Sequence, residues 1–383
     1  MAEILFVSSA VLIAYCYFGY PAILAALSRA LHQPIRKADI TPRVSLIVAA
    51  YNEEKDIARK LENAFALDYP ADKLEIVLAS DCCTDRTEEI ARKFGERVKV
   101  YRSPRRLGKT AAQNRAAALS NGEILVFSDA TTDYHPASVR NLVRSFADPV
   151  VGCVAGRLIY QDTARAMVGS GCISYWSYES SLKLYESRLA SLIGVSGCMY
   201  GVRRSSYSGL DRELSSDFVI AAEMKRLSLR TVYEPEAICF EETNHRPADE
   251  IRMRVRVIEQ TITALSRYRE VLNPRQHGLF AFQMLSHKVA RYMVPWLMIA
   301  AFLANVAAAD SSPALGGTLL LQEAFYSAAI CGLVLDRLGV GLRLVGIPYY
   351  FVLTNAAAAM GLIKFLMGRQ HILWDPVREA SQE

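Results

Sequence analysis

Long apolar runs lie near both ends of the chain, and only short ones lie between them. One run covers residues 4–28, and three more cover 290–308, 316–335 and 345–367. Each run is long enough to cross a bilayer as a helix, which takes about 20 apolar residues. The stretch between them has short apolar blocks set among charged residues. The pattern therefore predicts a soluble domain that is held between membrane segments.

Residues 39–165 alternate between strand patterns and helix patterns. Short blocks rich in apolar and β-branched residues predict strands at 44–50, 74–79, 97–101, 123–128 and 151–159. The segments between them predict helices at 53–66, 86–94, 109–120 and 136–146. Such alternation is typical of βαβ units that build a mostly parallel sheet. Open sheets of this kind bind ligands at the carboxyl ends of their strands.

The block at residues 44–54 is a strand pattern that runs into a helix pattern. Most of residues 44–50 are apolar, and several are β-branched, which predicts a buried strand. Ala50 is small enough to let a ligand approach the backbone. Asn52 is expected to cap a helix that begins at Glu53, with acids near the positive end of the helix dipole. This arrangement suits a nucleotide phosphate, although an ordinary strand–helix junction has the same residues.

Residues 168–190 and 247–270 carry apolar side chains at helical spacing with charges between them. Each segment is expected to be either a core helix or a helix in the membrane interface. The interface is favoured for 168–190, because a domain tethered at both ends must sit against the bilayer. The chain then divides into a transmembrane helix with a linker (1–38), a soluble domain with interface helices (39–275) and a membrane domain of three apolar segments (276–383).

The composition agrees with a membrane-bound protein that handles an anion. Hydrophobic residues make up 52% of the chain, and the mean hydropathy is +0.13. The net charge is +5, and basic residues cluster at 102–109, 202–204 and 252–256. Such clusters suit an anionic ligand or a membrane surface. No basic stripe with interleaved aromatic residues is present, so we expect no nucleic-acid partner.

The charges beside the first apolar run orient the soluble domain. Glu3 precedes this run, and Arg29, Arg36 and Lys37 follow it. The positive-inside rule then places the amino terminus outside and the next domain in the cytosol. The run has no small-residue cleavage motif, so we expect an anchor rather than a signal peptide. The eight cysteines show no metal-ligand spacing and are expected to be reduced, as in the cytosol.

The charges near the carboxyl terminus conflict with this orientation. Four membrane crossings from an outside amino terminus leave the carboxyl terminus outside. Lys364, Arg369 and Arg378 favour the cytosol instead. One of the four apolar runs is therefore expected to be re-entrant or to lie in the interface.

Two carboxylates and a lysine follow predicted strands. Asp81 ends the second strand, where it could accept a hydrogen bond from a base or a ribose. Asp129 ends the fourth strand, where it could hold Mg²⁺ or Mn²⁺ that bridges a pyrophosphate. Gly108 and Lys109 open the helix after the third strand, where the lysine could meet a phosphate. Helix caps and turn acids are the structural alternatives for the two carboxylates.

The order and spacing of these blocks resemble the GT-A core of membrane-bound family 2 glycosyltransferases. The blocks that carry the resemblance are residues 44–54, 80–86, 108–114, 127–136, 194–204, 215–218, 252–260 and 286–291. They extend over nearly the whole chain. This superfamily includes the cellulose, chitin and hyaluronan synthases and many exopolysaccharide and lipid glycosyltransferases. The resemblance implies an α/β GT-A domain, which binds a nucleotide-diphosphate sugar, with flanking transmembrane helices.

The resemblance also implies residues that bind the nucleotide sugar. Ala50, Tyr51 and Glu53 would line the nucleotide pocket. Asp81 would hold the uracil or the ribose, and Lys109 would lie near the diphosphate.

Residues for the metal, the reaction and the acceptor follow in the same way. Asp129 matches the first acid of the family's metal-binding Asp-x-Asp motif. Asp217 matches the catalytic base of Thr-Glu-Asp, although it could also merely cap the helix that follows. Arg256 matches the arginine of Gln-x-x-Arg-Trp, which contacts the leaving diphosphate. Gly197 and Cys198 fall where residues of the acceptor pocket lie in the family.

Some positions depart from the family pattern. Thr131 replaces the second acid of Asp-x-Asp, so the metal would rest on Asp129 with Asp133 or His135 as a helper. Two other motifs are also incomplete, and the residues that replace their members are Ser216, Met253 and Val257. The last of these replaces a tryptophan that belongs to the polymer channel of processive synthases, which disfavours a polymerase.

We therefore predict an inverting, metal-dependent hexosyltransferase that uses a UDP-linked sugar. Its acceptor would be a lipid-linked glycan or a glycolipid at the cytosolic face of a bacterial inner (plasma) membrane. Two alternatives stay open at this point. One is a processive polysaccharide synthase, and the other is a catalytically silent membrane scaffold that binds a nucleotide.

Overall fold

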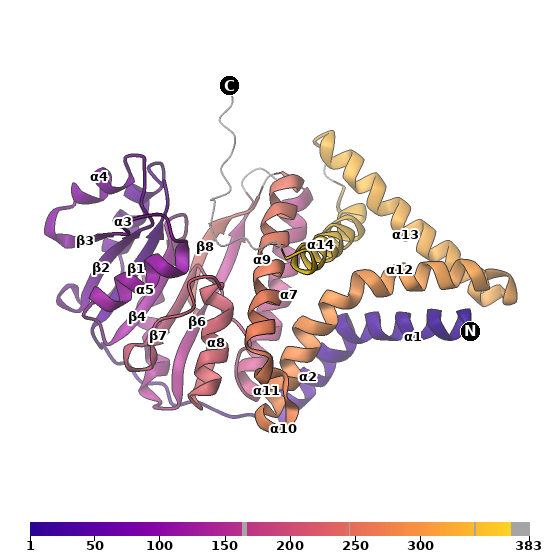
Figure 1. The fold of residues 1–383 in the computed structure, drawn as a ribbon, viewed down its shortest axis with the longest axis horizontal. Coiled ribbons are helices and arrows are strands. Elements are labelled where there is room, and N and C mark those ends of the chain that lie inside the picture. The colour runs from indigo at the N-terminus through magenta and orange to yellow at the C-terminus, as the bar shows by residue number, and fades with distance from the viewer. Residues whose placement is uncertain (163–166, 245, 341, 369–383) are drawn as a thin grey trace.

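The computed structural model describes all residues except 163–166, 245, 341 and 369–383 (Figure 1). Arg369 and Arg378 therefore lie outside the described residues. The middle of the chain forms one sheet in the order β3-β2-β1-β4-β7-β6-β8-β5. The strands are β1 (Val44–Ala50), β2 (Leu74–Ser80), β3 (Val98–Arg102), β4 (Ile124–Asp129), β5 (Asp133–Tyr134), β6 (Val151–Gln161), β7 (Met199–Arg203) and β8 (Arg230–Glu242).

The sheet is mixed, although the expectation was a mostly parallel one. β1 runs parallel to β2 and β4, and β2 runs parallel to β3. β7 lies antiparallel between β4 and β6, and β6 runs parallel to β8. The five predicted strands are confirmed, whereas β5, β7 and β8 were not predicted. β7 is short and contains a glycine, and β8 mixes charged with apolar residues, so neither gives a clear strand pattern.

Helices cover both faces of the sheet and bury two separate hydrophobic cores. Leu46 and Val48 of β1 pack on one face, and Ile47 between them packs on the other. This alternation follows from the two-residue period of a strand, and burial on both sides is typical of a central parallel strand. The helices of the soluble domain are α3 (Ile57–Phe65), α4 (Thr87–Arg92), α5 (Lys109–Leu119), α6 (Ser138–Val143), α8 (Ser216–Arg226) and α10 (Pro274–His277), with short 3₁₀ turns at Ala71–Lys73, Gly95–Arg97, Arg144–Ala147, Arg204–Ser206 and Arg269–Leu272.

Asn52 does not cap a helix, so this expectation is wrong. α3 begins at Ile57, and Asn52 lies in a loop with a φ of 55°. Its side-chain oxygen accepts a hydrogen bond of 2.7 Å from the backbone N–H of Thr84. Asparagine tolerates this left-handed backbone better than most residues. The contact fastens the loop after β1 to the loop after β2.

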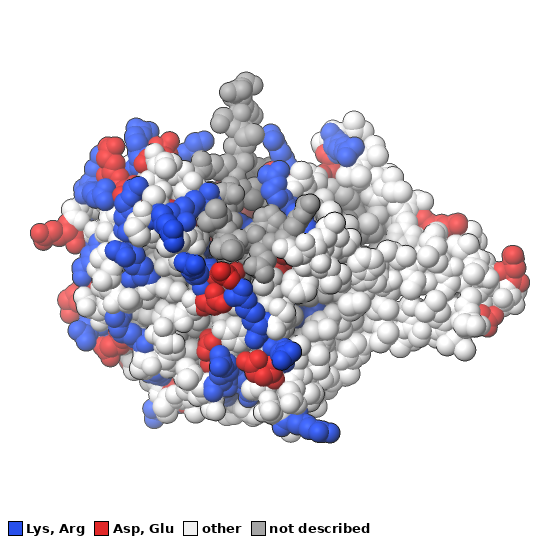
Figure 2. Space-filling view, viewed as in Figure 1, with Lys and Arg blue, Asp and Glu red and all other residues white. Residues whose placement is uncertain are grey.

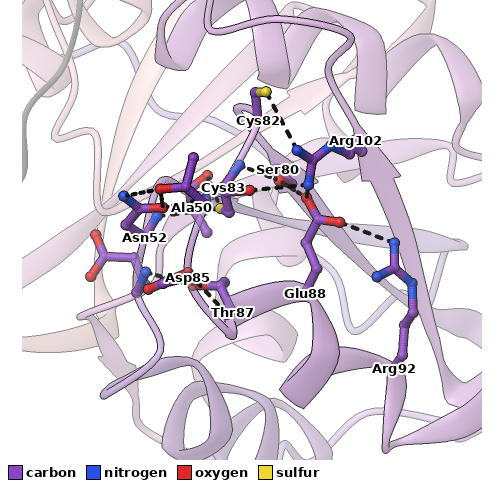
Figure 3. Close-up of polar contacts among 12 residues, drawn as sticks. Ala50, Asn52, Ser80, Cys82, Cys83, Asp85, Thr87, Glu88, Arg92 and Arg102 are labelled. Atoms are coloured by element: carbon purple, nitrogen blue, oxygen red, sulfur yellow. Dashed lines mark hydrogen bonds and ion pairs between the residues drawn. The ribbon is translucent and has the colours of Figure 1, made fainter.

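Ionic contacts fasten β2 and β3 to α4 in the same region (Figure 3). Ser80 donates to Glu88 over 2.6 Å, and Arg102 reaches the same carboxylate at 2.7 Å. Arg92 binds the other oxygen of Glu88 at 3.0 Å. Arg102, a member of the basic cluster at 102–109, thus has a structural partner rather than an anionic ligand.

Within the residues that the structure describes, four helices are long and apolar enough to cross a membrane. Their surface in Figure 2 is mostly without charged side chains, which appear only at the tip far from the sheet and at a few points along the upper edge. The first consists of α1 (Ala2–Ala14), a π-helical turn η1 (Tyr15–Gly19) and α2 (Tyr20–Ala30), and the second of α11 (Leu279–Met284), a π-helical turn η7 (Leu285–Val289), α12 (Ala290–Ala308) and a 3₁₀ turn (Ala309–Ser311). The other two are α13 (Pro313–Arg337) and α14 (Arg343–Leu366).

The two π-helical turns touch each other where the membrane helices meet the soluble domain. The hydroxyl groups of Tyr15 in η1 and Ser286 in η7 are 2.7 Å apart. Below them, Tyr20 donates to Glu186 over 2.7 Å. Such turns occur often at functional sites because they redirect side chains within a helix. The first and second membrane helices are thereby joined to the soluble domain at one level.

α7 (Met167–Leu189) and α9 (Pro247–Arg267) lie between the sheet and the membrane helices (Figure 1). Arg254 of α9 belongs to the basic cluster at 252–256 but does not face a membrane surface, because its side chain is only 12% exposed and pairs with Glu250 at 2.7 Å. The hydroxyl of Tyr350 in α14 donates to the same glutamate over 2.8 Å. α14 is seen nearly end-on in Figure 1, so it runs across the direction of α1 and α12 while it packs on α9.

Candidate active site

A large cleft of about 1940 Å³ opens at the carboxyl ends of β1 and β4. Its inner end is lined by Lys109, Asp129, Gly197 and Asp217. It then continues between α7 and α9 and reaches residues of η1, α13 and α14. The candidate site for a nucleotide and the membrane helices therefore share one continuous space.

Three charged side chains from three elements meet around Gly197. Lys109 at the start of α5 forms an ion pair with Asp129 at the end of β4. A β-carbon built on Gly197 would lie 3.1 Å from Lys109 Nζ and 3.4 Å from Asp217 Oδ2. The lysine and Asp217 thus lie close to the same glycine. The absence of a side chain at 197 leaves them room to face the cleft.

The carboxylates keep Lys109 charged. Burial alone would lower the pKa of its ammonium group, but Asp129 and then Asp217 raise that pKa above its ordinary value. The Lys109 side chain is only 20% exposed, and a cation that is largely removed from water is stable only when anions balance it. The ammonium group therefore stays charged in the cleft, where it could contact a phosphate.

Asp217 lies in the first turn of α8, with one carboxylate oxygen held and the other turned to the cleft. The hydroxyl of Ser215 donates to Oδ1 of Asp217. Oδ2 is the oxygen nearest Gly197. The backbone oxygen of Asp217 accepts a hydrogen bond from the N–H of Val195 over 2.9 Å, which fixes the segment before Gly197 to α8. This arrangement suits a proton acceptor with a fixed orientation.

Asp81 holds the loop that leads to Lys109. The backbone N–H groups of Leu107 and Gly108 donate to its two carboxylate oxygens over 2.8 and 2.9 Å. Its own N–H donates to the carbonyl of Ala50 over 3.0 Å. Asp81 does not line the cleft, so its contact with a uracil or a ribose stays a prediction.

The other expected nucleotide residues are divided between the cleft and its margin. Glu53 lines the cleft, and its N–H donates to the Thr87 hydroxyl over 2.7 Å. Ala50 and Tyr51 do not line it, and the Arg106 guanidinium lies 3.8 Å from the centre of the Tyr51 ring.

Arg256 and the expected acceptor residues also reach the cleft. Arg256 on α9 lines the cleft, as do Gly197 and Cys198. The Cys198 sulfur lies 3.6 Å from that of Cys239, so this side chain faces the core beside another thiol. Both thiols are free, as are the other six cysteines, and the reduced state stays a prediction.

Glu241 at the end of β8 is a site residue that the sequence did not reveal. It lines the cleft, and its carboxylate accepts from the Thr131 hydroxyl over 3.2 Å. Burial and the nearby Asp129 raise its pKa to about 7. Two neighbouring carboxylates with a hydroxyl between them are hard oxygen donors, as Mg²⁺ and Mn²⁺ prefer. Asp129 and Glu241 could therefore share a divalent cation.

The helpers expected for Asp129 are placed differently. Asp133 lines the cleft but forms an ion pair with Arg59. His135 is exposed, and its ring nitrogen accepts from the backbone of Ala137 over 3.3 Å. Within the described residues, no group of three or more His, Cys, Asp or Glu side chains has the geometry of a metal site. A cation here would complete its shell with diphosphate oxygens and water.

Lys60 fixes the loop that follows Asp129. Its side chain is fully buried, its Nζ donates to the carbonyl of Thr132 over 2.6 Å, and it lies 3.9 Å from the centre of the Tyr134 ring. Burial lowers its pKa to about 8, against the opposing effect of nearby acidic groups. Lys60 thus holds the loop that follows Asp129 in place through its contact with Thr132.

Residues 45–210 match the sequence family described as Glycosyl transferase family 2. The probable glycosyltransferase YdaM of Bacillus subtilis is 26% identical over 218 residues, which are 52% of this chain and 51% of that protein. A β-monoglucosyldiacylglycerol synthase of Nostoc sp. is 31% identical over 145 residues, which are 36% of this chain and 31% of that protein. The chain thus spans about half or less of the length of these curated relatives.

A solved structure shares the fold over almost the entire chain. It is the mannosyltransferase PcManGT from Pyrobaculum calidifontis, in complex with GDP-Man and Mn²⁺. The TM-score is 0.73 with 22% sequence identity, and the match covers 96% of this chain and 100% of that one. The likeness confirms the expected GT-A fold and its arrangement with the flanking helices.

We predict that Glu241→Gln weakens Mn²⁺ binding by about tenfold, because it removes one of two neighbouring anionic oxygen donors. Calorimetric titration of the purified protein with Mn²⁺ measures this. Glu236→Gln is the matched control, since Glu236 lies on the same strand but is exposed and pairs with Arg144. Equal Mn²⁺ affinity in the Glu241 and Glu236 variants would exclude Glu241 as a ligand.

Proposed function

We propose that this chain, whose residues 45–210 belong to glycosyl transferase family 2, transfers a sugar from a nucleotide donor to a lipid-linked acceptor. One observation carries the proposal. Lys109, Asp129 and Asp217 meet around Gly197 in a cleft that continues to the membrane helices. The charged residues suit a polar nucleotide-sugar donor. The continuation of the cleft to the membrane helices suits an acceptor that has both a polar head and a lipid chain.

The donor diphosphate would lie beside Lys109 and Arg256. As the bond between the sugar and the diphosphate breaks, negative charge develops on the leaving group, and preorganised cations stabilise it. Asp129 and Glu241 would hold Mg²⁺ or Mn²⁺, which supplies further positive charge to the diphosphate when bound. The pairing of Lys109 with Asp129 fits this role, since it orients the ammonium group at the edge of the sheet.

Asp217 would take the proton of the acceptor hydroxyl as that oxygen attacks the anomeric carbon. Ser215 holds one oxygen of the carboxylate and leaves the other directed at the cleft. A single base on the side opposite the leaving group gives inversion at the anomeric carbon. The resemblance favours UDP as the nucleotide, whereas the mannosyltransferase of similar fold binds GDP-Man, so a screen of nucleotide sugars is needed to identify the donor.

We place the catalytic domain on the cytosolic face of a bacterial inner membrane, with α14 along the membrane surface rather than across it. α14 runs across α1 and α12 in Figure 1, and 39% of its most apolar window is buried, more than in the other three helices. Three crossings then remain. They return the chain to the cytosol, in agreement with the charge of Lys364, and this removes the conflict seen in the sequence.

Reporter fusions after residue 383 test this topology. Green fluorescent protein fused there should fluoresce, because it folds in the cytosol, and alkaline phosphatase fused at the same point should be inactive. The opposite pair of results would mean that α14 crosses the membrane.

Asp217→Asn should lower kcat by about 10²–10⁴-fold, the usual contribution of a positioned base, while donor binding is retained. The assay incubates the purified protein with nucleotide sugars, Mn²⁺ and a membrane lipid extract, and the glycolipids formed are analysed by mass spectrometry. Asp72→Asn is the matched control, because Asp72 is exposed at the opposite edge of the sheet. Full turnover by the Asp217 variant would refute the base assignment.

A further inference from the structure

The membrane-facing part of the cleft contains a second group of charged side chains. Lys183 and Glu179 come from α7, and Lys288 and Arg291 come from the second membrane helix. Lys288 lies in the π-helical turn η7, just where this helix meets the soluble domain. All four side chains line the same space as Asp217.

The acidic side chains in this group are already neutralised. Glu179 pairs with Arg291 at 2.5 Å and with His287 at 3.2 Å. Burial would raise the pKa of Glu179, but Arg291 and His287 hold it well below its ordinary value. Glu186 accepts from Tyr20 and lies 2.6 Å from the other ring nitrogen of His287.

Two lysines are left in excess of these acids. Lys183 donates to the Ser196 hydroxyl over 2.6 Å, and its ammonium group lies 4.9 Å from the centre of the Trp176 ring. Among the described residues, the ammonium group of Lys288 has no partner within hydrogen-bond or ion-pair distance, and the charged groups that act on it include Glu179 and Arg291. Burial lowers the pKa of Lys183. Glu179 opposes this lowering and Lys288 adds to it, so the two cations are near enough to repel each other. Glu179 is the acid that acts on both lysines, but it already pairs with Arg291 and His287, so the positive charge is only partly balanced and an anionic ligand would complete the balance.

The position of the two lysines fits one part of an acceptor. Ser196, the partner of Lys183, is next to Gly197, where Asp217 and Lys109 meet. The same cleft is lined by Phe18 of η1 and Ile347 of α14, which are 76% and 70% exposed. A molecule in this space would therefore meet the base, the two cations and these exposed apolar side chains.

We propose that Lys288 and Lys183 bind the phosphate that joins the head group of the acceptor to its lipid chain. The lipid chain leaves the cleft between η1 and α14, and a hydroxyl of the head group reaches Asp217. This inference rests on the proposed function and names its acceptor class, a lipid phosphate or diphosphate that carries a sugar. A neutral glycolipid, such as the name of the Nostoc relative suggests for that protein, would leave both lysines without an anionic ligand.

Three probes test whether the site recognises a lipid phosphate as a whole. Farnesyl diphosphate has both the chain and the anion, farnesol has the chain alone, and inorganic pyrophosphate has the anion alone. Binding to the full-length protein in detergent is measured by microscale thermophoresis without added divalent metal, so that the donor site does not dominate. We expect farnesyl diphosphate to bind at least about tenfold tighter than either farnesol or pyrophosphate, because it offers both the anion and the chain. Equal binding of farnesol and farnesyl diphosphate would overturn the proposal, and so would equally tight binding of pyrophosphate.

Substitutions locate the effect. Lys288→Gln should weaken farnesyl diphosphate binding by about tenfold and leave farnesol binding nearly unchanged, and Lys288→Arg should restore the preference. Lys183→Gln gives a second test if Lys288→Gln does not fold. Lys93→Gln, which removes an exposed lysine of the soluble domain, is the matched control. A Lys288→Gln variant with wild-type preference would refute the assignment, whereas loss of sugar transfer alone concerns the proposed function and not this phosphate site.

Discussion

The ion pair between Lys109 and Asp129 is the interaction on which the rest of the site depends. It joins the start of α5 to the end of β4, and Asp217 approaches the same lysine across Gly197. Buried charges of this kind are tolerated only when each is balanced. The sheet brings the two charges together because its parallel strands end at one edge. There Asp81 holds the loop before Lys109, and Lys60 holds the loop after Asp129.

A second polar network positions the cleft against the membrane helices. The hydroxyl of Tyr20, the ring of His287 and the carboxylate of Glu186 form one connected group at the level of the two π-helical turns. Glu186 and His287 of this group also line the cleft. The same contacts that attach the domain to its membrane helices therefore bring the acceptor region beside the catalytic residues.

Much of this arrangement could be predicted from the sequence, and the failures have physical causes. Local sequence patterns predict strands β1–β4 and β6 and the membrane segments. The family resemblance adds the positions of Lys109, Asp129 and Asp217. Glu241 could not be found, because it ends a strand without a clear pattern and becomes relevant only beside Asp129. The cap expected at Asn52 failed because its partner, Thr84, comes from another loop.

The most direct test of the account is an experimental structure of the protein with Mn²⁺ and the sugar nucleotide that it turns over. We expect the diphosphate to lie between Lys109 and Arg256 and the metal to contact Asp129. Asp217 should face the anomeric carbon on the side away from the diphosphate. A nucleotide sugar bound outside this cleft, or a sugar ring out of reach of Asp217, would contradict the account.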